Sequence, residues 1–196
     1  TLAISSAASD VYKRQRKIVH IGTGAVIPMA WWFAIPAPIA IPFAGVVPLA
    51  TAINQCWRLI PAVEDVDRNS YGTTAYGLAI TTLLMLFWPS RPDAVCAGVL
   101  VMACGDGLAG LIGRAVTSPR WSVAGQTKSL AGTTTMLMVS FGVLLALSIT
   151  GGSGANWTVA LLLSVVATGL EQLSPAGIDN LSVPLVVGCL WAATLS

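Results

Sequence analysis

The sequence predicts an all-α fold: a polytopic integral membrane bundle of about seven transmembrane helices. Of its 196 residues, 55% are hydrophobic and 9% are charged, whereas soluble domains carry about 25% charged residues. The mean hydropathy is +0.78. Apolar stretches recur at roughly 17 to 22 residues, a length that crosses a hydrocarbon core about 30 Å thick. They leave no room for a separate soluble domain, and the net charge of +2 gives no indication of nucleic-acid binding.

Apolar runs and the breaks between them set the predicted spans. We expect helices at residues 17–35, 37–57, 72–88, 93–113, 129–149, 155–173 and 181–195. Four prolines fall in or beside the second span, at Pro36, Pro38, Pro42 and Pro48. Because proline removes a helix hydrogen bond, we expect this span to be kinked or partly re-entrant.

The first fifteen residues differ from the rest of the chain. They are polar and lack the apolar run of a cleavable signal peptide. Their string SAASDVYKRQ resembles translated library-adapter sequence. We therefore expect residues 1–15 to be a non-native or disordered leader, and residues 16–196 to form a single transmembrane domain.

The charged residues predict the orientation in the membrane. Basic residues near span ends are retained on the cytoplasmic side, and with the N-terminus inside only Arg91 of the ten Lys and Arg residues falls outside. The inner segments also hold most of the carboxylates. Asp106 and Glu171 lie within spans, where a charge costs roughly 2.5 to 3.5 kcal/mol on insertion scales, so both are functional candidates. We expect the active site at this cytoplasmic face.

The first candidate motif is the glycine-rich segment around Asp106. Carboxylate oxygens are usual ligands of Mg²⁺, and glycines let a phosphate or another backbone approach closely. The alternative is a small-residue face for helix packing, which explains the glycines but leaves the charge of Asp106 unexplained. The candidate nucleotide-binding residues here are Gly105, Gly107, Gly110 and Arg114.

The second motif, GQTKSLAGT at residues 125–133, opens the fifth predicted helix on the inner face. Thr127 or Ser129 can cap that helix, and Lys128 adds a cation to its positive N-terminus. Such a helix start binds phosphates. The alternative is an ordinary snorkelling lysine beside a cap. The candidate phosphate ligands are Lys128, Ser129, Gly132 and Thr133; the segment is not a Walker A motif.

Three further inner segments carry candidates. His20 is the only histidine, about one turn beyond the pair Arg16 and Lys17, which also serve as an orientation signal. The loop at residues 64–73 is either a solvated connection or support for a metal nucleotide, with candidates Glu64, Asp67, Arg68 and Tyr71. The segment at residues 171–181 supplies Glu171, Asp179 and Asn180, of which the last two are alternatively helix caps.

These segments together resemble the phytol, farnesol and dolichol kinases, which phosphorylate an isoprenoid alcohol with CTP or another nucleoside triphosphate. The motifs are RKIVH, NSYGTTAY, MACGDGLAGLIGR, GQTKSLAGTT and EQLSPAGIDNLSVPL, in family order over roughly residues 16–190. The resemblance is strongest to the phytol kinase-like branch of photosynthetic bacteria and plastids. One departure is Ala131, where the family usually has an acidic residue. Either Glu64 or Asp67 compensates, or this branch uses another nucleotide geometry.

The resemblance implies a magnesium-dependent kinase of a membrane alcohol such as phytol, farnesol or geranylgeraniol, with CTP as the favoured nucleotide. Phosphoryl transfer requires mainly positioning and charge neutralisation. We expect Asp106, with Glu171 or Asp179, to hold Mg²⁺. Lys128 and the following amides would bind phosphates, and His20, Arg114 or Asp179 would orient or deprotonate the alcohol. The expected location is a bacterial inner, thylakoid or plastid membrane.

Two other functions remain open at the level of sequence. A CTP:phosphatidate cytidylyltransferase shares the membrane setting and the nucleotide, but its C-terminal signature of basic and acidic residues is absent here. A small-solute transporter would suit the proline-rich second span. Transporters, however, keep polar residues near the bilayer midplane, whereas those of this chain gather at one interface.

Overall fold

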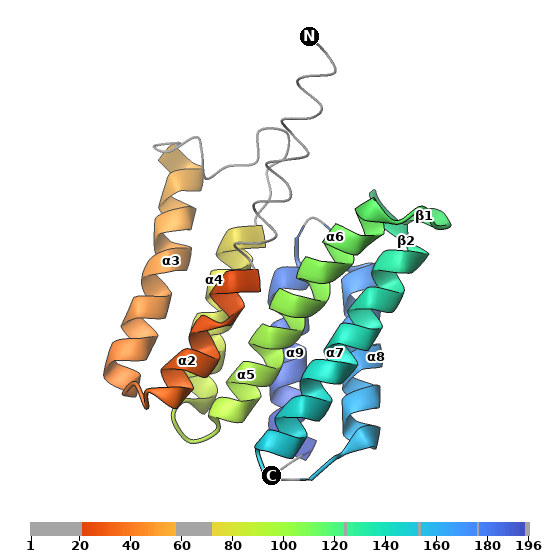
Figure 1. Cartoon of the computed structure of the whole chain (residues 1–196). Coiled ribbons are helices and arrows are strands. Elements are labelled where there is room, and N and C mark those ends of the chain that lie inside the picture. Colours follow the sequence, from red (N-terminus) through yellow and green to blue (C-terminus); the bar gives the residue numbers. More distant parts are fainter. Residues whose placement is uncertain (1–20, 58–71, 124, 153, 176, 195–196) are drawn as a thin grey trace.

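The computed structural model describes residues 21–57, 72–123, 125–152, 154–175 and 177–194. These residues form a bundle of helices with one short hairpin of strands at its end (Figure 1). The elements are α2 (Val26–Trp32), α3 (Ala37–Trp57), α4 (Gly72–Phe87), α5 (Pro92–Leu100), the π-helical segment η2 (Val101–Asp106), α6 (Gly107–Ala115), β1 (Arg120–Val123), β2 (Gln126–Ser129), α7 (Leu130–Thr150), α8 (Trp157–Leu173) and α9 (Asp179–Thr194).

The observed helices follow the predicted spans closely. In the described part of the chain, three helical stretches are long and apolar enough to cross a membrane: Ala37–Asn54, Pro92–Ala115 and Leu130–Thr150. Gly72–Phe87 and Trp157–Leu173 are shorter apolar helices. The chain is therefore a helical membrane protein, while the count of seven spans and the cytoplasmic N-terminus stay predictions.

The proline-rich second span is a continuous helix in the described residues, so the re-entrant path that we considered is not observed there, while the kink stays a prediction. α3 runs without interruption for 21 residues, with Pro42 and Pro48 inside it. Pro38 lies in the first turn, where the missing N–H costs no intrahelical bond. Pro48 packs on α4 at Gly77, where an added Cβ would lie 2.9 Å from the Pro48 ring. The small residue thus lets the two helices approach closely.

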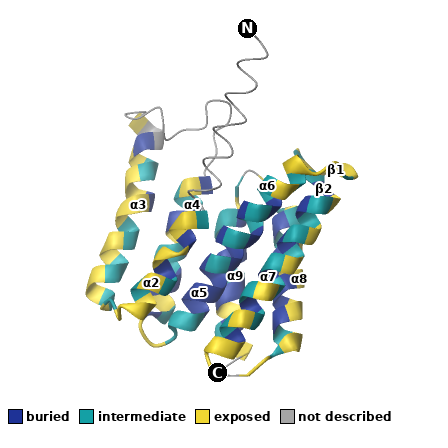
Figure 2. Cartoon of the chain, viewed as in Figure 1, coloured by how far each residue is buried: buried dark blue, intermediate teal, exposed yellow. Residues whose placement is uncertain are grey.

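The core of the bundle is the continuous helix formed by α5, η2 and α6. Most of its residues from Ala94 to Ala103 are buried, and α4, α7 and α9 pack around it (Figure 2). The predicted span of residues 93–113 agrees with this helix, although its π-helical turn was not predicted. Because the part from Ala94 to Ala103 is central, it faces protein and not lipid.

The two ends of the bundle differ in chemistry. The ends of α6 and α8, the start of α9 and the β1–β2 hairpin lie at one end, and the α2–α3 turn lies at the other (Figure 1). Arg91 immediately precedes α5 and lies at the same end as the α2–α3 turn. The described segments predicted to share one membrane face, residues 114–123, 125–128, 171–175 and 177–181, therefore lie together.

The lateral surface is apolar, as contact with lipid requires. α3 exposes Phe43 and Trp57, and Trp32, the last residue of α2, is 86% exposed. Exposed apolar patches of this extent mark contact with a membrane or a partner. Since the spans have transmembrane length, we assign this surface to lipid.

Candidate active site

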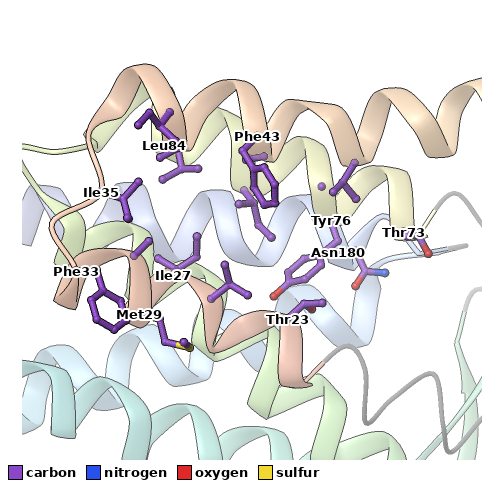
Figure 3. Close-up of a pocket in the computed structure, with 18 of the residues that line it drawn as sticks. Thr23, Ile27, Met29, Phe33, Ile35, Phe43, Thr73, Tyr76, Leu84 and Asn180 are labelled. Carbon is purple, nitrogen blue, oxygen red and sulfur yellow. The ribbon is translucent and has the colours of Figure 1, made fainter.

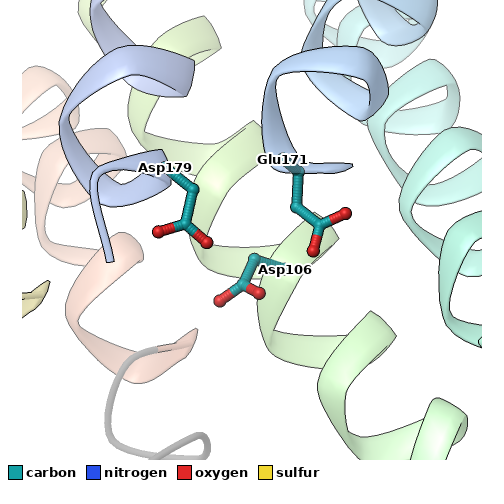
Figure 4. A group of neighbouring side chains, drawn as sticks. All are labelled: Asp106, Glu171 and Asp179. Carbon is teal, nitrogen blue, oxygen red and sulfur yellow. The ribbon is translucent and has the colours of Figure 1, made fainter. Parts of the chain in front are cut away.

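Three carboxylates from three different helices meet inside the bundle. Asp106 ends η2, Glu171 lies in the last turn of α8, and Asp179 begins α9. One carboxylate oxygen from each lies within 4.8 Å of the others, and Figure 4 shows the side chains directed toward one another. Glu171 and Asp179 are buried, and Asp106 is half-buried. We call these three residues the carboxylate cluster.

Local backbone structure brings each member to this point. The π-helical turn from Val101 to Asp106 widens the central helix at Asp106, and such turns often occur at functional sites. α8 ends at Leu173, and Gly177, with a φ of 85°, turns the chain into α9. Asp179 stands at the start of α9, where the helix dipole favours a negative charge. Its carboxylate also accepts a 3.0 Å hydrogen bond from the backbone N–H of Asn180.

Lys128 is the cation beside the cluster. Its Nζ forms a buried ion pair with Glu171 and donates a 2.9 Å hydrogen bond to the carbonyl of the same residue. The negative charge of Glu171 is unfavourable at the C-terminus of α8, where the helix dipole is also negative. Lys128 binds both the carboxylate and the backbone carbonyl of Glu171, so its positive charge offsets both. Gln172 Nε2 donates to the other Glu171 oxygen at 2.8 Å and to Thr133 Oγ1 at 2.9 Å.

Among the described residues, the charge balance of the site is negative. Three carboxylates this close repel one another, and Lys128 supplies one positive charge. Carboxylate oxygens are the ligands that Mg²⁺ prefers. The donor set therefore fits a divalent cation of the Mg²⁺ type, which would be held by Asp106, Glu171 and Asp179.

Ser129 is the cap of α7, one of the two residues that the sequence offered for that role. Its Oγ accepts a 3.1 Å hydrogen bond from the N–H of Gly132. The other candidate, Thr127, lies in β2. Lys128 precedes the cap and pairs with Trp121 of β1 in the hairpin. The hairpin thus fixes the start of α7 against the carboxylate cluster.

The glycines around Asp106 are explained by helix packing. A Cβ at Gly105 would lie 2.6 Å from Met136 Sδ of α7, and one at Gly107 would overlap Ile21. At Gly132 a Cβ would lie 3.1 Å from the Ala109 carbonyl of α6. The packing alternative therefore accounts for these three glycines, and a nucleotide contact at them stays a prediction.

The remaining predicted residues divide into three groups. Gly110 is half-buried on α6, and Arg114 is exposed in its last turn. Asn180 lies on the first turn of α9 beside the cluster. The following candidates lie outside the described residues: Arg16, Lys17, His20, Glu64, Asp67, Arg68 and Tyr71.

An apolar groove of about 660 Å³ runs between α2, α3 and α4. Its walls are aliphatic and aromatic, with Ile27, Ala40 and Phe43 among them. Its polar end is formed by five residues, four of them labelled in Figure 3: Thr23, Thr73, Tyr76, Asp106 and Asn180. Asp106 belongs to both the groove and the carboxylate cluster, so the two sites are continuous.

Sequence reasoning missed the groove, the π-helical turn and the β1–β2 hairpin. The hairpin had a signal, because RWSV and QTKS are short strand-like runs on either side of Ala-Gly, and Gly125 has a φ of 75°. The groove had none, since its residues are ordinary apolar residues on three separate helices. Gln172, which binds Glu171 and Thr133, was also not singled out.

Several characterised proteins are similar to this chain. It is 43% identical over 185 residues to a phytol kinase from Synechocystis sp., covering 91% of this chain and 78% of that protein. It is 32% identical to a chloroplast phytol kinase from Arabidopsis thaliana, covering 92% and 66%. A dolichol kinase from the same plant is 33% identical over 156 residues, covering 70% and 27%. No family model and no solved structure matches.

The fold and the site define a polytopic helical membrane protein with a carboxylate centre inside the bundle, open to an apolar groove. Identity of 43% to the cyanobacterial protein, over most of both chains, then settles the family. The chain belongs to the phytol kinase family.

Proposed function

We propose that this protein transfers the terminal phosphoryl group of a nucleoside triphosphate, CTP being favoured, to the hydroxyl of an isoprenoid alcohol at the cytoplasmic membrane face. Family membership already makes it a kinase that acts on an alcohol. The similar proteins are named for phytol and for dolichol, which supports an isoprenoid substrate such as phytol, farnesol or geranylgeraniol.

One observation carries the proposal: Asp106 borders the carboxylate cluster on one side and the apolar groove on the other. A kinase of a bilayer-dissolved alcohol needs a water-accessible place for a metal nucleotide and an apolar place for a hydrocarbon tail. It needs them in contact, because the reacting atoms must approach to about 3 to 3.5 Å. The continuity at Asp106 meets that requirement.

Different residues of the site would bind the metal ion and the phosphates during phosphoryl transfer. Asp106, Glu171 and Asp179 would hold Mg²⁺, which when bound supplies charge neutralisation on the phosphates. Lys128 lies next to them, paired with Glu171, and would contact a phosphate oxygen. The first three backbone N–H groups of α7 are already bonded within the protein, to the Pro119 carbonyl, Ser118 Oγ and Ser129 Oγ. Lys128 and the metal would therefore stabilise the charge that develops on the transferring phosphoryl group.

The alcohol also needs a group to accept its proton. Of the three candidates from the sequence, Arg114 is exposed at the end of α6, and His20 lies outside the described residues. Asp179 is in the cluster and is followed by Asn180, which lines the groove. Among the described residues we therefore assign proton acceptance to Asp179, a carboxylate suited to general-base work.

The proposal is tested by product analysis with purified protein in detergent or vesicles. Labelled CTP, UTP or ATP is supplied with Mg²⁺ and phytol, farnesol or geranylgeraniol, and in a parallel reaction with phosphatidate, the acceptor of the alternative enzyme. The expected products are the prenyl monophosphate and the nucleoside diphosphate. Release of pyrophosphate with a cytidylyl lipid would establish the cytidylyltransferase instead, and absence of any phosphorylated lipid with every pairing would overturn the proposal.

A further inference from the structure

One buried acceptor at the polar end of the groove has no partner. Among the described residues, Asn180 Oδ1 is the single buried side-chain polar atom without a hydrogen bond. Leaving such a group unsatisfied is unfavourable, so native proteins rarely keep one. Asn180 lines the groove at the end that Asp106 shares with the carboxylate cluster. A ligand hydroxyl there would satisfy this acceptor.

The far end of the groove lies at the α2–α3 turn. Phe33, Ile35 and Leu84 line that end, opposite Asn180 and Tyr76 (Figure 3). Trp88 donates a 2.8 Å hydrogen bond from Nε1 to the Ile35 carbonyl, which fastens the turn to the end of α4. The near end is polar and the far end is apolar, so the groove matches a linear molecule with one polar head.

The length of the groove follows from helix geometry. Thr73 and Leu84 on α4 both line it, and a rise of 1.5 Å per residue separates them by about 16 Å along the axis. An extended isoprene unit, with four carbons along the chain and C–C bonds of about 1.5 Å, spans about 5 Å. The groove therefore holds about three to four isoprene units.

The groove also opens sideways. Met29, Phe33 and Phe43 line it and are each more than half exposed on the apolar surface of α2 and α3. In a membrane this side faces lipid, so a hydrocarbon tail can enter from the bilayer without crossing water. A water-soluble ligand would have to cross that hydrocarbon to enter by the same side.

We propose that this groove binds the isoprenoid tail of the alcohol substrate, that Asn180 Oδ1 accepts the hydrogen bond of its hydroxyl in the bound state, before that proton passes to Asp179 during transfer, and that groove depth selects alcohols of three to four isoprene units. The inference rests on the proposed function. It adds the size of the substrate, the groove that binds the isoprenoid tail and the residue that binds the hydroxyl. Ala40 and Ala44 set two depths in the groove, because Ala40 lies one helical turn, about 6 Å, farther from the polar end.

Substitutions at Ala40 and Ala44 test whether groove depth selects alcohols by chain length. Ala40→Phe is expected to lower kcat/KM at least about tenfold for geranylgeraniol while leaving that for geraniol, with two isoprene units, nearly unchanged. Ala44→Phe is expected to lower both. Ala50→Phe adds the same volume to α3 at an exposed alanine outside the groove and is expected to change neither. Equal loss for both alcohols with Ala40→Phe, or no loss, would overturn the inference.

Substitution of Asn180 tests the seat of the hydroxyl. Asn180→Leu is expected to raise KM for the alcohol about tenfold or more and to leave KM for the nucleotide unchanged. Asn180→Ser, which retains an acceptor oxygen, is expected to recover part of that loss. Thermal unfolding of Asn180→Leu without substrate should occur at the wild-type temperature or above it, since an unsatisfied acceptor is removed. A lowered unfolding temperature with an unchanged alcohol KM would assign Asn180 a structural role instead.

A binding measurement separates failure of the inference from failure of the proposed function. A photoreactive geranylgeraniol analogue is irradiated with the protein without nucleotide, and the labelled peptides are mapped. We expect labelling in Ile39–Val47 of α3 that excess geranylgeraniol suppresses and Ala40→Phe reduces. Such labelling in a protein that phosphorylates no alcohol would support binding of the tail in the groove and contradict the proposed kinase function. Active protein labelled equally over all lipid-facing helices would reject the groove.

Discussion

At the scale of single residues, the ion pair between Lys128 and Glu171 is the most consequential contact of the site. Both side chains are about 10% exposed or less, so each charge depends on the other for compensation. Breaking such a pair by removing one partner leaves an uncompensated buried charge and costs about 3 to 5 kcal/mol. Lys128 thus stabilises the fold in addition to its proposed contact with phosphate.

Lys128→Met is therefore expected to lower the free energy of unfolding by about 3 to 5 kcal/mol and to lose most turnover. The double substitution Lys128→Met with Glu171→Gln should recover much of the stability, because no buried charge is left alone, but not the activity. Denaturant unfolding in detergent and the phosphorylation assay measure the two effects.

Arg120→Met is the matched control, since Arg120 is exposed on the neighbouring strand, and it should change stability by less than about 0.5 kcal/mol. Full turnover by Lys128→Met would remove this lysine from the site.

The sequence predicted the members of the carboxylate cluster but not how Lys128 is held. Asp106 and Glu171 could be identified because each is a charged residue within an apolar span. Burying such a charge is unfavourable, and helix packing gives no reason to keep it. Pairing of Lys128 with Glu171 depends on how α7 and α8 lie together, 43 residues apart in sequence. Nothing local in the sequence specifies that pairing. The same holds for the unpaired oxygen of Asn180, which appears only when three-dimensional neighbours are known.

At the scale of elements, close helix approaches hold the carboxylates in register. α9 packs against α5 at Gly98, where an added Cβ would overlap the backbone carbonyl of Pro184. At Gly188 a Cβ would lie 3.0 Å from the carbonyl of Ala94. Because α9 begins with Asp179, its distance from α5 decides where Asp179 lies relative to Asp106. Two glycines remote from the site thus position one of its ligands.

Gly98→Ala is expected to lower the free energy of unfolding by about 1 to 3 kcal/mol, the usual cost of overpacking, and to reduce turnover by moving α9. Gly142→Ala is the matched control, because Gly142 lies in α7 and a Cβ there meets nothing within 4 Å. It should raise stability by about 0.5 to 1 kcal/mol through helix propensity. Unfolding curves and activities of the two variants make the comparison; equal stability would contradict this role of Gly98.

Helix positions could be predicted well because apolar length alone specifies a span. The π-helical turn before Asp106 could not, since its sequence, VMACGD, is compatible with an ordinary α-helix. The path of α3 also depends on tertiary contacts. Pro42 and Pro48 suggested a kink or a re-entrant turn, whereas the helix is continuous and Pro48 is buried against α4. Neighbouring helices thus override the local preference of proline.

At the scale of the whole molecule, the two ends of the bundle carry different polar networks. Lys128, the carboxylate cluster and the hairpin belong to the first end, and Arg91 belongs to the second. Arg91 forms an ion pair with Asp93, which also accepts a 2.8 Å hydrogen bond from Trp191 Nε1. This second network joins α5 to α9 and has a structural explanation without a ligand.

The predicted orientation places the hairpin in the cytoplasm and the turn before Arg91 on the opposite side. In a cysteine-free background, Ser122→Cys and Ser90→Cys each put one exposed thiol at one end of the bundle. A membrane-impermeant maleimide should label Ser122→Cys in inside-out vesicles and Ser90→Cys in right-side-out vesicles. Labelling in the reverse pattern would place the site on the outer face.

The most direct test of the central claim compares two carboxylates on the same long helix. Asp106 joins the carboxylate cluster to the groove, whereas Asp93 belongs to the structural network at the other end. Phosphoryl transfer from labelled nucleotide to geranylgeraniol is measured for Asp106→Asn and Asp93→Asn, per mole of folded protein. We predict that Asp106→Asn loses at least about a hundredfold in turnover, as expected for a lost electrostatic ligand, and that Asp93→Asn retains near-normal turnover with lower stability. Normal turnover by Asp106→Asn would contradict the account.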